Sequence, residues 1–418
     1  MTITALLKKP QSEYEFFLQM PRNTRVLLAT NMIYAFVLPV IEIFVGAYIM
    51  RSSNDPAIVA IYQLTVYTGI PLTFLINGFL LNRVKIPHLY SFGMLLSALS
   101  MVVMMSLTNL SVVGVGVAGI LMGCSFGFFW ANRDFLALST TNDSTRNYYY
   151  GLETFFYTIT YIVVPLVVGA YIANVSVQGG SINTAYKIVT FVVFLLTIVA
   201  SVIIHQGTFK KPELKKFLYF KFHVLWRKML VLAGLKGLAQ GYLVTAPAIL
   251  IMRLVGNEGS LGLVQGISGV ATAVLLYLLG RTTKPSDRIY IFTAGILIFL
   301  AGTVVNGILF SAVGVIVFVL CKVLFSPLHD IAYYPTQMRV IDVVSKIEKR
   351  NEFTYIFNHE FGLYIGRFIG LALFIYLDTY ISESFALKYA LIIIGILQLA
   401  SIPMARHIIK ETDKLDNA

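Results

Sequence analysis

Several ionisable side chains fall within long apolar runs of this sequence, where a charge needs a specific partner or a task. A charged group at the middle of such a run costs about 2.5–3.5 kcal/mol when the run enters a bilayer. Groups of this kind bind charged molecules, exchange protons or hold helices together. The basic residues concerned are Arg133, Lys236, Lys322 and Arg367, the acidic ones are Glu42, Asp134, Glu153, Asp330 and Glu360, and His329 titrates near neutral pH.

The first group of charges lies near the middle of its apolar runs. Lys322 and Arg367 are central, and Lys236 stands about a third of the way along its run. Glu42 follows Pro39 by three residues. If these charges face one aqueous cavity, its positive surplus favours an anionic substrate, or an anionic group on a larger one. The alternative is that Glu42 pairs with one lysine while the other cations reach the membrane surface or bind backbone carbonyls.

Further residues extend this candidate substrate site. Gln240 lies one helical turn after Lys236, so the two side chains would share one face. Tyr34 adds a polar and aromatic surface to the first run. Glu42 is the leading candidate for proton coupling, because the proton affinity of a carboxylate depends on its exposure and on nearby cations.

A second group of charges lies toward one end of the runs and recurs along the chain. One run ends in Asn-Arg-Asp at 132–134 and another in Leu-His-Asp at 328–330. Glu153 and Glu360 stand near the starts of the runs that follow. The recurrence predicts that the acidic positions serve both copies of a repeated fold.

The cations of this second group differ in chemistry. Arg133 is always charged, so we expect it to form a fixed ion pair with Glu153. His329 changes its charge near neutral pH, so with Asp330 and Glu360 it is expected to form a switchable gate or a proton-linked site. These two carboxylates are the next candidates for proton coupling. The alternative is that all of these groups form static ion pairs that hold helix ends together.

The elements that position these charges are membrane spans. Of the 418 residues, 57% are hydrophobic and 12% are charged, and the mean hydropathy is +0.79. A soluble protein of this length could not bury so much apolar surface, whereas a membrane helix needs roughly 20 apolar residues. We therefore expect an all-α polytopic membrane protein with about twelve transmembrane helices. The expected spans are 25–50, 57–81, 87–108, 111–138, 149–173, 186–205, 228–252, 260–280, 288–309, 312–335, 353–377 and 386–405.

The chain repeats its own landmarks. Arg25 opens the first span and Arg51 follows its end, and at the same separation Arg227 opens the seventh span and Arg253 follows its end. This self-similarity predicts two pseudo-symmetric six-helix halves, 1–205 and 228–418, with a substrate site between them. A basic connector, 206–227, joins the halves. Its lysines alternate with aromatic residues, which favours a helix in the membrane interface over a solvated linker.

Lysine and arginine gather on one side of the expected spans, which sets their orientation. The other side carries only Arg51, Lys187, Arg253 and Lys388. We therefore expect an integral protein of the plasma (cell inner) membrane with both termini in the cytoplasm. The net charge of +12 is then explained by contact with anionic membrane lipids, without nucleic acid.

A basic motif between the second and third spans, Gly-Phe-Leu-Leu-Asn-Arg-Val-Lys at 78–85, completes this pattern. With the whole-chain topology, it makes the chain resemble the major facilitator superfamily. The resemblance implies a gating role for Gly78, Asn82 and Arg83, although the family usually has an acidic residue where this chain has Asn82. The weaker counterpart in the second half begins at Gly280. The same gate would include Arg133, Asp134 and Glu153.

The resemblance implies alternating access by rocking of the two halves, and a monomer. We expect a secondary active transporter of a small organic anion or zwitterion, coupled to protons and without a cofactor or a metal site. The alternative is an exporter or flippase of a lipid or an amphiphilic drug-like molecule. No Gly-x4-Gly-Lys-Ser/Thr phosphate loop and no His-Glu-x-x-His site occurs in the sequence, so an ATP-driven pump or a zinc-dependent enzyme is not expected.

Overall fold

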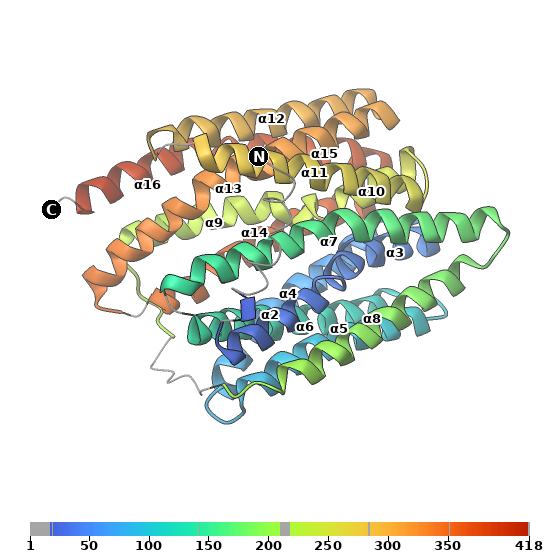
Figure 1. Ribbon diagram of the computed structural model, residues 1–418. Helices are drawn as coiled ribbons and strands as arrows, with labels where there is room; N and C mark the ends of the chain where they lie inside the picture. The colour runs from blue at the N-terminus through green and yellow to red at the C-terminus, as the bar shows by residue number, and fades with distance from the viewer. Residues whose placement is uncertain are drawn as a thin grey trace, which may run out of the picture.

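The computed structural model describes residues 17–18, 20–141, 143–209, 218–282, 285–350 and 352–416. Across these ranges the regular structure is helical, without a strand (Figure 1). Eleven helices in these ranges are long and apolar enough to cross a membrane. The expected all-α polytopic membrane fold is confirmed.

The expected first span is present in three pieces, α2 (Arg22–Tyr34), the π-helical η1 (Val40–Phe44) and α3 (Val45–Ser53). Pro39 has no N–H to donate, and its ring disfavours a straight helix before it. The turn before Pro39 has a hydrogen bond between residues three apart, in which the Phe36 N–H donates to the Ile33 carbonyl at 3.2 Å. Single π turns are frequent at functional sites, and this one carries Glu42.

The remaining helices before the connector follow the expected spans closely. Asp55 caps the next helix by accepting from the Ala57 N–H at 2.8 Å, with Pro56 in the first helical position. Ser111 caps another through the Gly114 N–H. These helices are α4 (Pro56–Leu80), α5 (Ile86–Ser106), α6 (Val112–Thr140), α7 (Asp143–Val177) and α8 (Ile182–Ile204).

The helices after the connector depart from the expected spans at three places. The expected span 228–252 is divided into α9 (Val224–Leu243) and α10 (Ala246–Leu254). α13 runs on to Glu348, past the expected end at 335, because Val340 and Val344 continue its buried face beyond Pro335. The last expected span is divided near Leu399 into α15 and an amphipathic α16. The elements are α9 (Val224–Leu243), α10 (Ala246–Leu254), α11 (Glu258–Thr282), η2 (Pro285–Asp287), α12 (Arg288–Leu309), α13 (Ala312–Glu348), α14 (Glu352–Tyr380), α15 (Glu383–Gln398) and α16 (Ser401–Asp416).

The helices pack into two groups that meet along two contacts. In one group α6 packs on α4 and α5, and α8 packs on α2 and α5. In the other α13 packs on α12, α14 on α9, and α15 on both α12 and α14. The groups touch mainly where α7 meets α11 and where α4 meets α14 (Figure 1).

Two glycines mark an equivalent helix crossing in each group. A Cβ on Gly93 of α5 would lie 2.9 Å from the Phe129 nitrogen of α6. A Cβ on Gly295 of α12 would lie 3.0 Å from the Leu328 Cβ of α13. Each crossing therefore needs a residue without a side chain, and each positions the end of the helix that carries Asp134 or Asp330.

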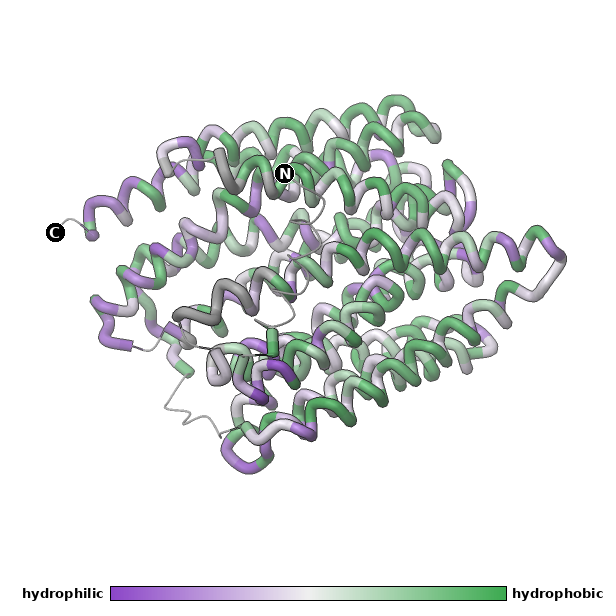
Figure 2. The backbone as a smooth tube through the Cα atoms, in the orientation of Figure 1, coloured by the Kyte–Doolittle hydropathy of each residue, from purple (hydrophilic) through white to green (hydrophobic). Residues whose placement is uncertain are grey.

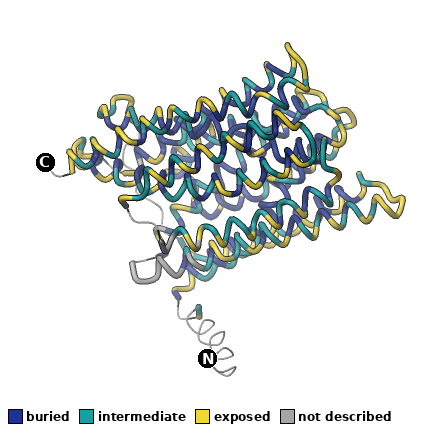
Figure 3. Tube along the Cα trace, turned by 90° about the horizontal axis from the view of Figure 1, so that it is seen from above, coloured by how far each residue is buried: buried dark blue, intermediate teal, exposed yellow. Residues whose placement is uncertain are grey.

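Hydrophobic residues occupy the middle of the bundle and hydrophilic residues its two ends (Figure 2). Seen from above, the exposed residues lie on the outside of the bundle and the buried residues inside (Figure 3). Exposed apolar side chains such as Val167, Phe191 and Ile365 are suited to lipid contact. The protein is thus an integral membrane protein. We call its two ends the Arg51 end, where α3 and α10 finish, and the α16 end, where α16 finishes.

Candidate functional site

A cavity of about 490 Å³ lies between the two helix groups. The helices α4, α6, α9 and α14 line it together with η1. It collects five of the residues expected to do chemistry, namely Glu42, Asp134, Gln240, Glu360 and Arg367. Tyr62, Gln63, Tyr67 and Trp130 complete its polar and aromatic lining. We call it the central cavity.

Arg367 is the cation of the central cavity. Its Nε and Nη2 donate to Gln240 Oε1 at 3.2 and 2.9 Å, and its Nη1 lies 3.6 Å from Glu360 Oε2. Its guanidinium also lies 4.8 Å from the ring centroid of Tyr67, across the contact of α4 with α14. Gly241 lets α9 approach α14 closely at this point, because a Cβ there would lie 2.5 Å from the Arg367 carbonyl.

Glu42 lies at the boundary between the central cavity and a second one. Its Oε2 accepts a hydrogen bond from the Tyr161 hydroxyl at 2.6 Å. Tyr161 in turn lines a cavity of about 360 Å³ between α7, α11 and α13, which also holds Lys322 and Gln265. Lys322 thus lines the same cavity as Tyr161, the hydrogen-bond partner of Glu42. Within the described ranges no ion pair or hydrogen bond is formed by the Lys322 ammonium.

Lys236 lines neither cavity, so the expectation of one cavity for all three central cations is corrected. Its side chain is 4% exposed, and its ammonium lies 2.7 Å from Asp330 Oδ1. It also lies 3.8 Å from the ring centroid of Tyr334 and 4.2 Å from that of Tyr333. A buried lysine needs an anionic partner, and the carboxylate of Asp330 in α13 is that partner. The Lys236 ammonium is therefore already paired within the protein.

His329 contacts Asp330 but not Glu360. Its Nδ1 lies 3.3 Å from Asp330 Oδ1, and its ring stacks on Tyr333. Glu360 faces Arg367 instead. Because His329 and Asp330 belong to the same helix, their contact cannot by itself join the two groups. Tyr333 also hydrogen-bonds His359 at 2.7 Å, a buried partner that the sequence pattern did not indicate.

The structure brings Arg133, Asp134 and Glu153 together. The Arg133 Nε donates to Glu153 Oε1 at 3.0 Å, and its Nη1 lies 2.7 Å from Asp134 Oδ1. Glu153 also accepts from Asn31 at 2.5 Å and from Tyr149 at 3.2 Å. All of these contacts stay within one helix group, as a fixed clamp requires. Polar residues such as Asn31, inside an apolar run, were the signal in the sequence for this network.

The remaining expected site residues lie away from the cavities. Tyr34 is fully buried, donates to Ser97 at 3.0 Å and packs on Phe129, so its expected place at the substrate site is corrected. Gly78 is buried near the end of α4, while Asn82 and Arg83 are exposed in the turn that follows. Gly280 lies in the last turns of α11.

The connector is described only in part. Residues 210–217, on which the expected interfacial helix falls, lie outside the described residues. In the segment before them, the Thr208 N–H donates a hydrogen bond to Asn23 Oδ1 of α2 at 3.0 Å. Glu348 of α13 holds the segment after them through the His223 N–H at 2.6 Å, and residues 218–223 are not helical.

Two arginines close the Arg51 end. Arg51 binds Glu258 in a two-pronged ion pair, with Nη2 2.5 Å from Oε2, and Tyr186 donates to the same carboxylate at 3.1 Å. Arg253, the counterpart of Arg51 in the repeat, donates to Asn54 at 2.7 Å. Each arginine thus reaches the other helix group. The matched positions were visible in the sequence, but their partners were not.

Close helix packing supports this closure. A Cβ on Gly262 of α11 would lie 2.2 Å from the Pro165 carbonyl of α7. Glu258, at the start of α11, is 1% exposed. We call Arg51, Glu258, Tyr186, Arg253 and Asn54 the arginine lock. It holds the two groups together at this end.

Glu258→Gln is expected to loosen the arginine lock, because a charged hydrogen bond contributes about 1.5–3 kcal/mol and an amide keeps only part of it. The measurement is labelling of Ile41→Cys in the central cavity by an impermeant maleimide, in a background without Cys124 and Cys321. Labelling from the Arg51 end should rise about tenfold or more. Lys187→Gln is the matched control, because Lys187 is an exposed charge at the same end of the bundle and lies outside the lock. Equal labelling of both variants would contradict the lock.

No protein-family model matches the chain. The chain is 21% identical over 388 residues to the uncharacterized protein YqgE of Bacillus subtilis (strain 168), covering 88% of this chain and 86% of that protein. Among solved structures it is similar to the POT family transporter PepTSo, with a TM-score of 0.73, 10% identity and coverage of 95% of this chain and 99% of that one. The nucleoside transporter NupG gives a TM-score of 0.66, 10% identity and coverage of 93% and 99%. The chain therefore shares the fold of these transporters.

Proposed function

We propose that the protein is a secondary active transporter that works by alternating access between the halves 1–205 and 228–418. One observation carries this proposal: the central cavity, with charged residues in its lining, lies between two helix groups that the arginine lock joins at the Arg51 end. The transporter folds of PepTSo and NupG support it. Rocking of the groups about α7–α11 and α4–α14 would expose the cavity to each side in turn.

The proposed orientation places the Arg51 end outside the cell and the α16 end in the cytoplasm. The charge distribution supports it, because most lysines and arginines of the sequence belong to the α16 end. Both termini would then be cytoplasmic, and the membrane would be the plasma membrane. In this orientation the closed arginine lock corresponds to a state that faces inward.

The proposed substrate is a small zwitterion or organic anion. Arg367 and Gln240 offer donors for an anionic group. The carboxylates Glu42 and Glu360 share the same cavity, so a substrate with a positive group as well fits its mixed charge best. Lys236 is occupied by Asp330 and is not assigned to the substrate.

Thermal stabilisation of the purified protein by a panel of small zwitterions, anions, cations and phospholipids tests the proposed substrate class. The zwitterions or anions should raise Tm most, and Arg367→Gln should abolish that rise. Stabilisation by cations alone would overturn this assignment.

The proposed coupling ion is the proton, and the proposed coupling residue is Glu42. It stands in a π turn and accepts a hydrogen bond from Tyr161, which lines the second cavity together with Lys322. A movement of α7 would displace Tyr161, and a movement of α13 would displace Lys322, so either movement would change the surroundings of the Glu42 carboxylate. Its proton affinity would therefore change with the conformation of the protein, which is what coupling requires.

The second cavity favours one alternative function, an exporter or flippase of an amphiphile. Lys322 forms its charged part, while Leu276 and Val319 form apolar lining. A phospholipid that raises Tm in wild type but not in Lys322→Met would support this alternative. An unchanged rise in Lys322→Met would leave the central cavity as the substrate site.

His329 is proposed to sense pH inside the second half. It lies between Tyr333 and Phe292, next to the pair of Lys236 with Asp330. A protonated His329 would compete with Lys236 for Asp330, so the contact of α9 with α13 should weaken in acid. Wild type should lose more Tm than His329→Gln between about pH 7 and about pH 5. Parallel pH profiles of Tm in the two proteins would exclude His329.

A further inference from the structure

The helix α16 separates its charges onto two sides. Its acidic residues bind the rest of the protein: Glu411 lies 2.7 Å from the Lys228 ammonium of α9, and Asp413 lies 2.5 Å from Arg339 Nη1 of α13. Asp416 also binds Arg339, at 3.0 Å. The carboxylates of this helix are therefore all paired with cations of the helix bundle, Asp413 and Asp416 with the same arginine.

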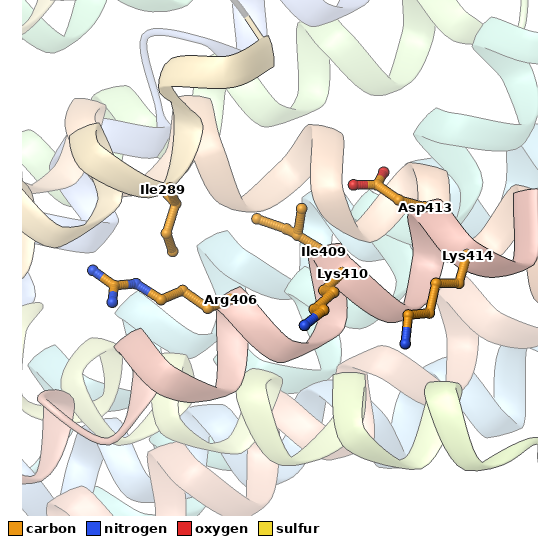
Figure 4. Close-up of a pocket in the computed structure, with 6 residues that line it drawn as sticks. All are labelled: Ile289, Arg406, Ile409, Lys410, Asp413 and Lys414. Carbon is orange, nitrogen blue, oxygen red and sulfur yellow. The ribbon is translucent and has the colours of Figure 1, made fainter. Parts of the chain in front are cut away.

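The basic residues of α16 form an exposed row along the helix. Arg406, Lys410 and Lys414 follow one another at intervals of four residues, so they share one face. Figure 4 shows Lys410 and Lys414 leaving the helix on the side opposite to Asp413. All three side chains are exposed, and none forms an ion pair with a described residue. We call these three residues the basic row.

The basic row borders a cavity of about 520 Å³ where α16 meets the start of α12. Ile289 and Ile409 form its apolar part (Figure 4). An adjoining cavity of about 270 Å³ adds Arg288 and Arg339. Asp413 also lines both cavities and is paired with Arg339. The site therefore combines an excess of positive charge with an apolar surface.

The apolar surface continues along α12 toward the middle of the bundle. Tyr290 is 73% exposed and Leu297 is 51% exposed on that helix. Both belong to a helix long and apolar enough to span the bilayer, so they face lipid chains. A molecule with a charged head at the basic row would have room for acyl chains beside them.

We propose that the basic row and the Ile289 surface bind an anionic phospholipid, with its phosphate on Arg406, Lys410 and Lys414 and its chains along α12. The charge complementarity selects the headgroup, and the continuity with the lipid-facing side of α12 selects a membrane lipid over free phosphate. The bound lipid would fix α16 against the bilayer, and through Arg339 and Lys228 it would act on α13 and α9.

Native mass spectrometry of the full chain in detergent tests this site, with dioleoylphosphatidylglycerol and dioleoylphosphatidylcholine as probes. Wild type should retain phosphatidylglycerol selectively. The variant Arg406→Gln/Lys410→Gln/Lys414→Gln should bind it about 10- to 100-fold more weakly, since three cations contribute to the attraction. Binding of phosphatidylcholine should not change. The single variant Lys410→Gln, with a smaller loss, covers the case in which the triple variant folds poorly.

The matched control removes the same charge elsewhere at this end of the bundle. Arg22, Lys221 and Lys346 are exposed and line neither cavity of the α16 site. Their triple glutamine variant should bind phosphatidylglycerol as wild type does. If the control variant lost phosphatidylglycerol binding to the same extent, the effect would come from general surface charge, and the proposed site would be wrong. Displacement of the lipid by glycerol phosphate at the same concentration would overturn the assignment to a membrane lipid.

Discussion

Glu42→Gln is expected to uncouple transport from the proton gradient. A gradient of about two pH units stores ~2.7 kcal/mol per proton, which supports about a 100-fold accumulation of substrate. Glutamine can still accept the hydrogen bond from Tyr161 but cannot exchange a proton. The variant should therefore equilibrate its substrate without accumulating it, while counterflow exchange stays close to the wild-type rate.

Uptake into proteoliposomes, with and without an imposed proton gradient, measures this effect. The substrate is the member of the panel that most stabilises the wild-type protein. Glu352→Gln is the matched control, because Glu352 is exposed at the start of α14 and lines neither cavity. Wild-type accumulation by Glu42→Gln would move the coupling site elsewhere, with Glu360 the next residue to replace.

Arg367→Gln is expected to weaken substrate binding in the central cavity strongly. The guanidinium is its lining cation, and hydrogen bonds to charged groups contribute about 1.5–3 kcal/mol, or about 10- to 100-fold in affinity. Lysine should restore only part of the loss. Its single ammonium cannot hold Gln240, face Glu360 and meet the substrate in the planar geometry of arginine.

Affinity is measured from the shift of Tm with substrate concentration, so that folding and binding are separated in the same experiment. Arg22→Gln is the control, since it removes an exposed arginine at the start of α2. Equal affinity of Arg367→Gln and wild type would show that the substrate binds elsewhere. In that event the cavity of Lys322 would be the next candidate.

The membrane class, the number of spans and the positions of the unusual charges were readable in the sequence. These properties are local, because hydropathy accumulates along a run and a charge in an apolar run is costly wherever the run packs. The grouping of Arg133 with Glu153 was also readable, since both lie at adjoining helix ends. The expected first span was the continuous run 25–50, so the break near Pro39 and the π turn around Glu42 were seen only in the structure.

Only the tertiary structure decided which charges face the cavity. Lys236 and Gln240 are one turn apart, yet the lysine turns to Asp330 of α13 while the glutamine turns to Arg367 of α14. At about 100° of rotation per residue, two side chains four residues apart leave the helix only about 40° from each other. Which neighbouring helix each side chain meets therefore depends on how closely those helices approach. Glycines such as Gly241 set that approach. For the same reason the sequence marked Arg51 and Arg253 as a pair, but only the packed helices revealed Glu258 and Asn54 as their partners.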